Sequence, residues 1–394
     1  SRLRPLLLVA ELALALVLVV AGGLLLRSFG ALLRTDPGFQ PRRAAAFELT
    51  LPSDAYAQPA AMVRFYHDVL EQLGRLPQVE AAGLAAVPPL GGATNSTAVR
   101  LPGRAPAPPD HLPFANYTIV SSGYFAAAGT PILRGRDFSP ADTAQSLPVA
   151  IISAAMAAHY WPGRDPIGQQ VGPASPRLAA LTIVGVAADV KRQSLEEQPA
   201  PEMYVLYNQN PWPSMQTMDV VVRGRGDAGT LQGALAGAVH RVDPQVPLAR
   251  RTTLEALEDQ ALAGSDFLMW LMLGFGGMAT FTAMLGLYSV IAFEVQRRSP
   301  ELAIRLALGA TPQAVRRGVL RQGGALAGAG IACGLGAAWV LTRLMSGELY
   351  GVAPTDAATF AWAAGLLMAV ALAASYLPAR RAARLDPLRL LRCE

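Results

Sequence analysis

The sequence contains few charged residues and almost no cysteine. Charged residues make up 15% of its 394 positions, whereas 52% are hydrophobic. A soluble globular domain carries about 25% charged residues, so this composition excludes an ordinary soluble protein and indicates contact with lipid. Cys333 and Cys393 are the only cysteines, and we therefore expect no disulfide framework in any part outside the membrane.

The sequence also lacks the motifs of several enzyme classes. It has no GxSxG nucleophile elbow and no GxxxxGK[ST] phosphate loop, and its single lysine, Lys191, follows no glycine-rich turn. We therefore expect no cofactor and no ATP binding through such a loop. His67 with Glu71 and His240 with Asp243 have helical spacing, but no second His or Cys completes a metal pattern. Two solvated helix faces are the favoured interpretation.

Four apolar segments are too long for core helices of a soluble protein. The first contains only one charged residue, Glu11, and the other three contain none. Each could cross about 30 Å of hydrocarbon as a helix. A cleaved signal peptide is the alternative for the first, but that run exceeds the usual length of about 7–15 residues. Glu11 is a functional candidate, although snorkelling to the cytoplasmic interface explains it equally well. The predicted spans are Pro5–Leu26, Phe267–Phe293, Gln322–Thr342 and Ala357–Leu377.

The arginines outside these spans indicate the orientation. Residues 1–4, 294–321 and 379–394 hold 13 arginines against four acidic residues, whereas residues 343–356 hold one arginine and two acidic residues. Arginine near span ends marks the cytoplasmic side. We therefore expect a bacterial inner (cytoplasmic) membrane protein with both termini inside and residues 27–266 outside. The basic balance then reflects orientation, and we expect no nucleic-acid partner.

Strand and helix patterns alternate in the outside segment. A strand, an amphipathic helix and a second strand are predicted at Ala44–Leu51, Pro59–Leu76 and Val79–Val87. The same order recurs at Met218–Arg223, Ala228–Val242 and Val246–Arg250. Between these two units, further strands are predicted at Asn116–Val120, Val149–Ile152 and Leu181–Val186, with short helices near Tyr124 and at Ala154–Trp161.

These patterns define the predicted fold class. It is an α-helical membrane protein with four spans and a large α+β extracytoplasmic domain inserted between spans one and two. The first span and its stalk cover residues 1–39, and the outside domain covers 40–251. That domain consists of a split α/β subdomain (40–89 with 216–251) and a mainly β insert (90–215). Residues 252–394 hold a stalk helix, three spans, the cytoplasmic loop 294–321 and the tail.

Glycines recur at helix-packing intervals in two spans. Close approach of helices in lipid requires small residues, because lipid gives no hydrophobic drive for association. Spans that merely tolerate glycine in a glycine-rich protein are the alternative. The predicted helix-packing positions are Gly274, Gly277, Gly324, Gly328, Gly330 and Gly334.

The cytoplasmic loop contains a short capped helix. Ser299 is a good N-cap, Pro300 fits the first turn, and Gly309 suits the position after the end, which predicts nine helical residues. Thr311 and Pro312 repeat the start signal. In the short helix only Glu301 and Arg305 are charged, and the rest is Leu, Ile and Ala. Because such a helix is unstable alone in water, we expect it to lie in a partner's groove, with an interfacial anchor as the alternative.

The sequence of this helix resembles that of a known family. ELAIRLALGA at 301–310 is similar to the coupling-helix signature of the MacB/FtsX-type ABC permeases. Four further segments are similar to that family's periplasmic core and C-terminus. The chain resembles the second unit in the branch that fuses two permease units in one polypeptide, and we expect it to be part of a longer protein. These segments are PILRGRDF (131–138), WPGRDPIG (161–168), IVGVAADV (183–190) and YLPARRAARLDP (376–387).

The resemblance implies a non-catalytic permease of the mechanotransmission type, serving export or efflux. It implies a separate ABC ATPase subunit that binds ATP, and a second permease unit in a homodimer or fused pseudo-dimer within membrane lipid. A membrane scaffold or signalling subunit that regulates a periplasmic partner without transport is the alternative. A membrane-bound enzyme ranks third. The residues implied in ATPase coupling are Glu301, Leu302, Ile304, Arg305, Leu306, Gly309 and Ala310.

Overall fold

The protein divides into two compact units. The computed structural model describes residues 3–92, 95–102, 113–173, 179–209, 213–226, 228–308 and 310–383. The membrane unit comprises Ser1–Arg34 and Gly264–Glu394, and the outer unit comprises Thr35–Ala263. Within the described residues, four helices are long and apolar enough to cross a membrane, as predicted. They are α1 (Leu3–Leu32), α6 (Leu254–Arg297), α8 (Pro312–Leu344) and α9 (Ala357–Ala382).

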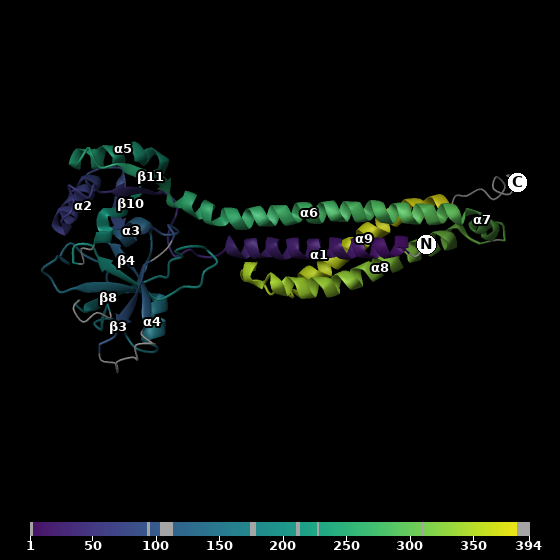
Figure 1. Ribbon diagram of the computed structural model, residues 1–394, viewed down its shortest axis with the longest axis horizontal. Coiled ribbons are helices and arrows are strands. Elements are labelled where there is room, and N and C mark those ends of the chain that lie inside the picture. The colour runs from purple at the N-terminus through teal and green to yellow at the C-terminus, as the bar shows by residue number, and fades with distance from the viewer. Residues whose placement is uncertain are drawn as a thin grey trace. The chain divides into compact units, whose positions relative to one another are not determined.

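Helices α1, α8 and α9 run side by side in the membrane unit (Figure 1). Their contact surface is built from leucines of α1, such as Leu12 and Leu16, and from small or β-branched residues of α8, such as Ala327 and Ile331. Leucines on α1 facing small residues on α8 explain the contact, because large side chains on one helix fill the space that small side chains leave on the other. The short helices α7 (Ser299–Ala307) and η3 (Ser346–Glu348) lie in the two connections.

The six predicted packing glycines fall into two groups. A Cβ atom added to Gly330 would lie 2.6 Å from the Cβ of Leu12, and one added to Gly334 would lie 2.9 Å from the Cβ of Leu16. These two glycines therefore allow α8 to approach α1 closely. By contrast, a Cβ added to Gly274, Gly277 or Gly328 would meet no atom within 4 Å, and one added to Gly324 would just reach Leu372.

The expectation for Gly274, Gly277 and Gly328 therefore does not hold within this chain. The reason is geometric, because spacing along a helix identifies a stripe of small residues but does not tell which stripe faces a neighbour. Close contacts occur instead at two other glycines. A Cβ on Gly323 would lie 2.3 Å from Ser375 Oγ of α9, and one on Gly286 of α6 would lie 2.8 Å from Glu11 Oε2.

The carboxylate of Asp356 connects α1 and α9 at the outer end of the membrane unit. Asp356 caps α9 by accepting hydrogen bonds from the Thr359 amide (2.8 Å) and hydroxyl (2.7 Å), and it also pairs with Arg27 of α1. At the next residue of α1, Ser28 Oγ accepts a hydrogen bond from the Tyr350 amide at 2.8 Å. The cap and the ion pair thus fix the start of α9 to the end of α1.

A four-stranded antiparallel sheet forms the first part of the outer unit. Its strand order is β11-β1-β10-β2, and α2 and α5 cover one face while α3 covers the other. Two βαβ units with this order form a split, ferredoxin-like arrangement, as the repeated strand-helix-strand pattern indicated. The elements are β1 (Ala44–Thr50), α2 (Pro59–Gly74), β2 (Val79–Ala85), α3 (Tyr124–Ala128), β10 (Thr217–Gly224), α5 (Ala228–Val242) and β11 (Leu248–Thr253).

The insert forms a closed ring of strands. From β4 the pairing passes through β3, β7, β8, β6 and β9 and returns to β4. Met203 and Val205 of β9 pack in the hydrophobic core, so Glu202 lies on the opposite face of β9. There Glu202 forms a buried ion pair with Arg192 at 2.6 Å, with both side chains 4% exposed, and Thr118 Oγ1 donates to Glu202 at 2.7 Å. The elements are β3 (Asn95–Arg100), β4 (Phe114–Val120), β5 (Ile132–Gly135), β6 (Val149–Ser153), α4 (Ala154–Tyr160), β7 (Gln170–Pro173), β8 (Leu181–Ala187), β9 (Glu202–Leu206) and η2 (Pro213–Gln216).

Strand β10 places a buried acidic residue in the first sheet. Alternate side chains such as Val220 pack in the core with α2 and α5, so Asp219 points to the opposite face. There Asp219 is 3% exposed, lies opposite Glu48 of β1 and accepts two hydrogen bonds of 3.2 Å from Arg250. Burial, opposed by Arg250 and assisted by Glu48, raises the pKa of Asp219 to about 6.

This buried carboxylate predicts a pH dependence of stability. The pKa of Asp219 is higher in the folded than in the unfolded chain. Its contribution to the free energy of unfolding is therefore favourable at about pH 4 and is lost as the pH rises through 6. In residues 35–263 expressed alone, Asp219→Asn should remove that loss. Relative to wild type, the variant should gain about 2–3 kcal/mol between pH 4 and 7 in denaturant unfolding. If the free energies of unfolding of the two proteins changed in parallel with pH, Asp219 would not be the source of this pH dependence.

The glycine contacts predict a difference between two positions on the same helix. Gly330→Leu should force α8 away from α1, because the new side chain would overlap Leu12, and overpacking costs about 1–3 kcal/mol. Gly328→Leu is the matched control, because nothing lies within 4 Å of its added Cβ. In detergent, the first variant should lower the apparent Tm by several degrees and the second should not. An equal shift for both would show that this contact does not hold the bundle.

Candidate functional site

The candidate site lies where α6, α7 and α8 meet. Backbone hydrogen bonds continue from α6 into α7, since the Arg298 amide donates to Glu294 O (3.0 Å) and the Leu302 amide donates to Arg298 O (2.9 Å). The start of α8 follows the predicted signal, because Thr311 Oγ1 accepts from the Ala314 amide at 3.3 Å. Ser299 differs from the prediction. It is the first residue of α7, and its hydroxyl donates to Gln296 O at 2.8 Å instead of capping the helix.

The predicted coupling residues lie on different sides of α7. Glu301, Ile304 and Arg305 are exposed, and Glu301 forms an ion pair with Arg305 along the helix. Leu302 is half-buried against the bundle core, so it supports α7 from inside. Ala310 lines a cleft beside the helix. Gly309 and the side chain of Leu306 lie outside the residues that the structure describes.

A cleft of about 300 Å³ opens between α7 and the ends of its neighbours. Two ion pairs line it, Arg298 with Glu294 at 2.8 Å and Arg305 with Glu301. The end of α6 and the first turns of α8 supply an apolar wall. This combination could receive a partner segment that has both apolar and charged side chains. The apolar lining residues are Ile291, Val295, Leu302, Val315 and Val319.

Sequence reasoning missed Leu308, whose side chain is 82% exposed. Its amide donates to Ile304 O at 2.9 Å, so the helical turn continues and places Leu308 one turn from Ile304 on the same face. Ile304 is itself 50% exposed. The i, i+4 spacing of Ile304 and Leu308 could have indicated this face. It was missed because the helix was predicted to end before Gly309. The exposed apolar stripe is therefore Ile304 with Leu308.

The segment that links α1 to β1 is held in place by contacts within the outer unit. The Arg223 guanidinium donates to the carbonyls of Gln40 (2.7 Å) and Arg42 (2.9 Å), and to two carbonyls of α3. Gly38 lies against Asp189, where an added Cβ would fall 1.8 Å from its carbonyl oxygen, and its φ of +82° also favours glycine. The link between α1 and β1 is thus held tightly to the folded part of the outer unit.

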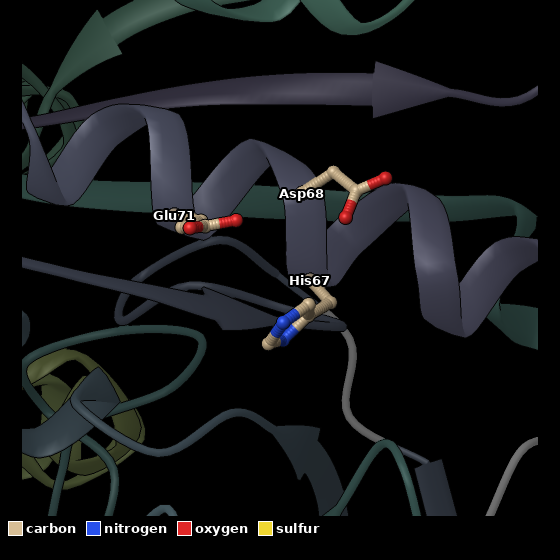
Figure 2. A group of neighbouring side chains, drawn as sticks. All are labelled: His67, Asp68 and Glu71. Carbon is tan, nitrogen blue, oxygen red and sulfur yellow. The ribbon is translucent and has the colours of Figure 1, made fainter.

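His67, Asp68 and Glu71 lie on exposed turns of α2, and their possible ligand atoms lie within 4.8 Å of one another (Figure 2). Glu71 is paired with Arg75 at 2.6 Å. The arrangement is a solvated helix face with an i, i+4 ion pair.

Comparison with known families covers nearly the whole chain. The model of the MacB-like periplasmic core domain matches residues 13–238, and that of the FtsX-like permease C-terminal domain matches residues 273–387. The chain is 27% identical to the macrolide export ATP-binding/permease protein MacB of Azoarcus sp. (strain BH72), and 26% identical to the pyoverdine export ATP-binding/permease protein PvdT of Pseudomonas syringae pv. syringae (strain B728a). Each match covers 72% of this chain.

The chain spans less than half the length of these relatives, 43% and 44% respectively. Among solved structures, the periplasmic region of MacB from Actinobacillus actinomycetemcomitans matches 58% of this chain and 97% of its own, with 12% identity and a TM-score of 0.38. The extracellular domain of the transporter YknZ from Gram-positive bacteria matches 52% and 100%, with 17% identity and a TM-score of 0.34. Because the first family model covers more than half of the chain, the protein belongs to the MacB/FtsX-like family of ABC permeases, with several membrane spans and a large periplasmic domain after the first.

Proposed function

We propose that this chain is the permease subunit of an exporter that transmits ATP-driven movement from a separate ATPase to its periplasmic domain. The chain contains no phosphate loop, so ATP would be bound by the partner. The natural location would be a bacterial inner membrane, with a second permease unit completing the transporter. The observation that carries the proposal is the exposed apolar stripe Ile304–Leu308 beside a charged cleft, on the side of the membrane where an ATPase works.

The surface around α7 suits a protein partner. In water, an exposed isoleucine and leucine on one helix face are unfavourable, and burying each in a groove contributes about 1.5–3 kcal/mol. The Glu301–Arg305 pair beside them is exposed, so it could exchange partners at little cost. Leu302 holds α7 to the bundle. Movement of the partner groove would therefore move the ends of α6 and α8.

Two features could carry this movement outward. Helix α6 runs without interruption for 44 residues, from the end of β11 to the start of α7, a length of about 66 Å. Its charge-free part, residues 267–293, needs only part of that length to cross the membrane. Arg223 fixes the other connection by holding the residues that follow α1. A stiff helix and a clamped link suit mechanical transmission better than a wide channel.

Export is supported by the relatives, which are named as exporters of macrolides or pyoverdine. If purified transporter shows ATPase activity that a periplasmic substrate stimulates, export is supported. Stable capture of a periplasmic enzyme without such stimulation would instead favour the scaffold function.

The coupling proposal predicts the effect of substitutions on the exposed face of α7. Ile304→Asp combined with Leu308→Asp should weaken association with the ATPase about 100-fold or more, because two buried apolar side chains would be lost. Arg305→Glu should weaken it as well, by placing two acidic side chains side by side. Affinity would be measured by pull-down or by surface plasmon resonance with full-length permease in nanodiscs.

Arg317→Glu is the matched control, because it makes the same charge change on an exposed residue of the same loop outside the cleft. It should bind the ATPase within about twofold of wild type. Wild-type affinity and wild-type ATPase stimulation in the α7 variants would show that this helix is only an interfacial anchor. Equal weakening by Arg317→Glu would show that only the net charge of the loop matters.

A further inference from the structure

A second cavity adjoins the cleft beside α7, because Glu294 and Gln322 line both. It has a volume of about 700 Å³ and lies between the first turn of α1, the last turns of α6 and residues 322–326 of α8. The two helix ends, of α1 and α6, lie at the same end of the membrane unit (Figure 1). The lining residues used below are Val290, Glu294, Arg297, Gln322, Ala325 and Leu326, and we call this cavity the inner groove.

The sequence places the inner groove at the depth of the lipid headgroups. The charge-free run of α6 ends at Phe293, and that of α8 begins at Gln322. The groove crosses both boundaries. Its side toward the membrane centre is apolar, with Val290, Ala325 and Leu326, whereas Arg297 and Gln322 lie where these helices reach water.

The charges of the inner groove favour an anion. Glu294 pairs with Arg298 at 2.8 Å, which compensates the acidic side chain in the wall. Among the described residues, no carboxylate lies within ion-pair distance of Arg297, which is exposed. An arginine presents a planar set of N–H donors that suits a phosphate, and Gln322 adds amide donors.

A second copy of this chain is a poorer occupant. The same face of a copy would bring further arginines, because residues 294–321 hold six arginines and two acidic residues. Like charges would then meet at the mouth of the groove. An anionic lipid brings the opposite charge and apolar chains at the same depth.

We propose that the inner groove binds one anionic phospholipid of the cytoplasmic leaflet. Its phosphate contacts Arg297 and Gln322, and one acyl chain lies along Val290, Ala325 and Leu326. Glu294 and Gln322 also border the cleft beside α7, so the bound lipid would touch the same helix ends that the ATPase moves. The lipid site goes beyond the proposed function and does not require it.

The test is native mass spectrometry of the full-length protein released from detergent, with phosphatidylglycerol or phosphatidylcholine added at equal concentration. Wild type should retain one phosphatidylglycerol at least about tenfold more strongly than phosphatidylcholine. Arg297→Gln should reduce that preference about fivefold or more. Arg317→Gln removes the same charge from the same loop but does not line the groove, and it should keep the preference within about twofold.

Ala325→Phe should fill the apolar wall and lower retention of both lipids, with the fold unchanged by circular dichroism. Equal loss in Arg297→Gln and Arg317→Gln would overturn the site and show diffuse attraction to the basic loop. Absence of any preference in wild type would overturn it as well. So would an intermolecular disulfide at Ala325→Cys in a background without Cys333 and Cys393, because the groove would then be an interface between copies.

Discussion

A movement at α7 can reach the periplasmic domain only if the connecting helices neither bend nor slide independently. Two features of the structure meet this constraint, one a helix contact and the other an uninterrupted helix. In the membrane, α8 approaches α1 so closely at Gly330 and Gly334 that any larger side chain would collide with Leu12 or Leu16. Close-packed contacts of this kind resist deformation, so helices that share them move together. The length of α6 supplies the second connection without a loop.

The periplasmic domain has the rigidity that such a mechanism needs. Its insert closes on itself through β4 and β9, which leaves no free edge along that pair, and Glu202 of β9 forms a buried ion pair with Arg192. A buried pair of this kind is weak evidence for stability, but it tolerates little displacement because a separated charge would remain buried. Arg223 then attaches the incoming chain to this rigid body.

The parts predicted from the sequence are those with strong local signals. Long charge-free runs gave the four spans, and the strand-helix-strand repeat gave β1, α2, β2, β10, α5 and β11 close to their observed bounds. The strands β3, β5, β7 and β9 were not predicted. They form because partners distant in sequence pair with them, and that pairing leaves little local signal. At the site, periodicity located α7 but did not show that Leu302 faces the bundle. Which stripe of a helix faces a neighbour depends on tertiary packing.

An interruption of α6 would show whether this helix transmits movement mechanically. A donor fluorophore at Asp54 of the periplasmic domain, with acceptors on the outer-leaflet lipid headgroups, would report movement of the domain when ATP is added to the reconstituted transporter. Insertion of two glycines between Ala263 and Gly264 leaves α7 and its partner surface intact. If α6 transmits the movement, the ATP-dependent change in energy transfer should disappear while ATPase binding is retained. Persistence of the full change in the interrupted protein would contradict transmission through α6.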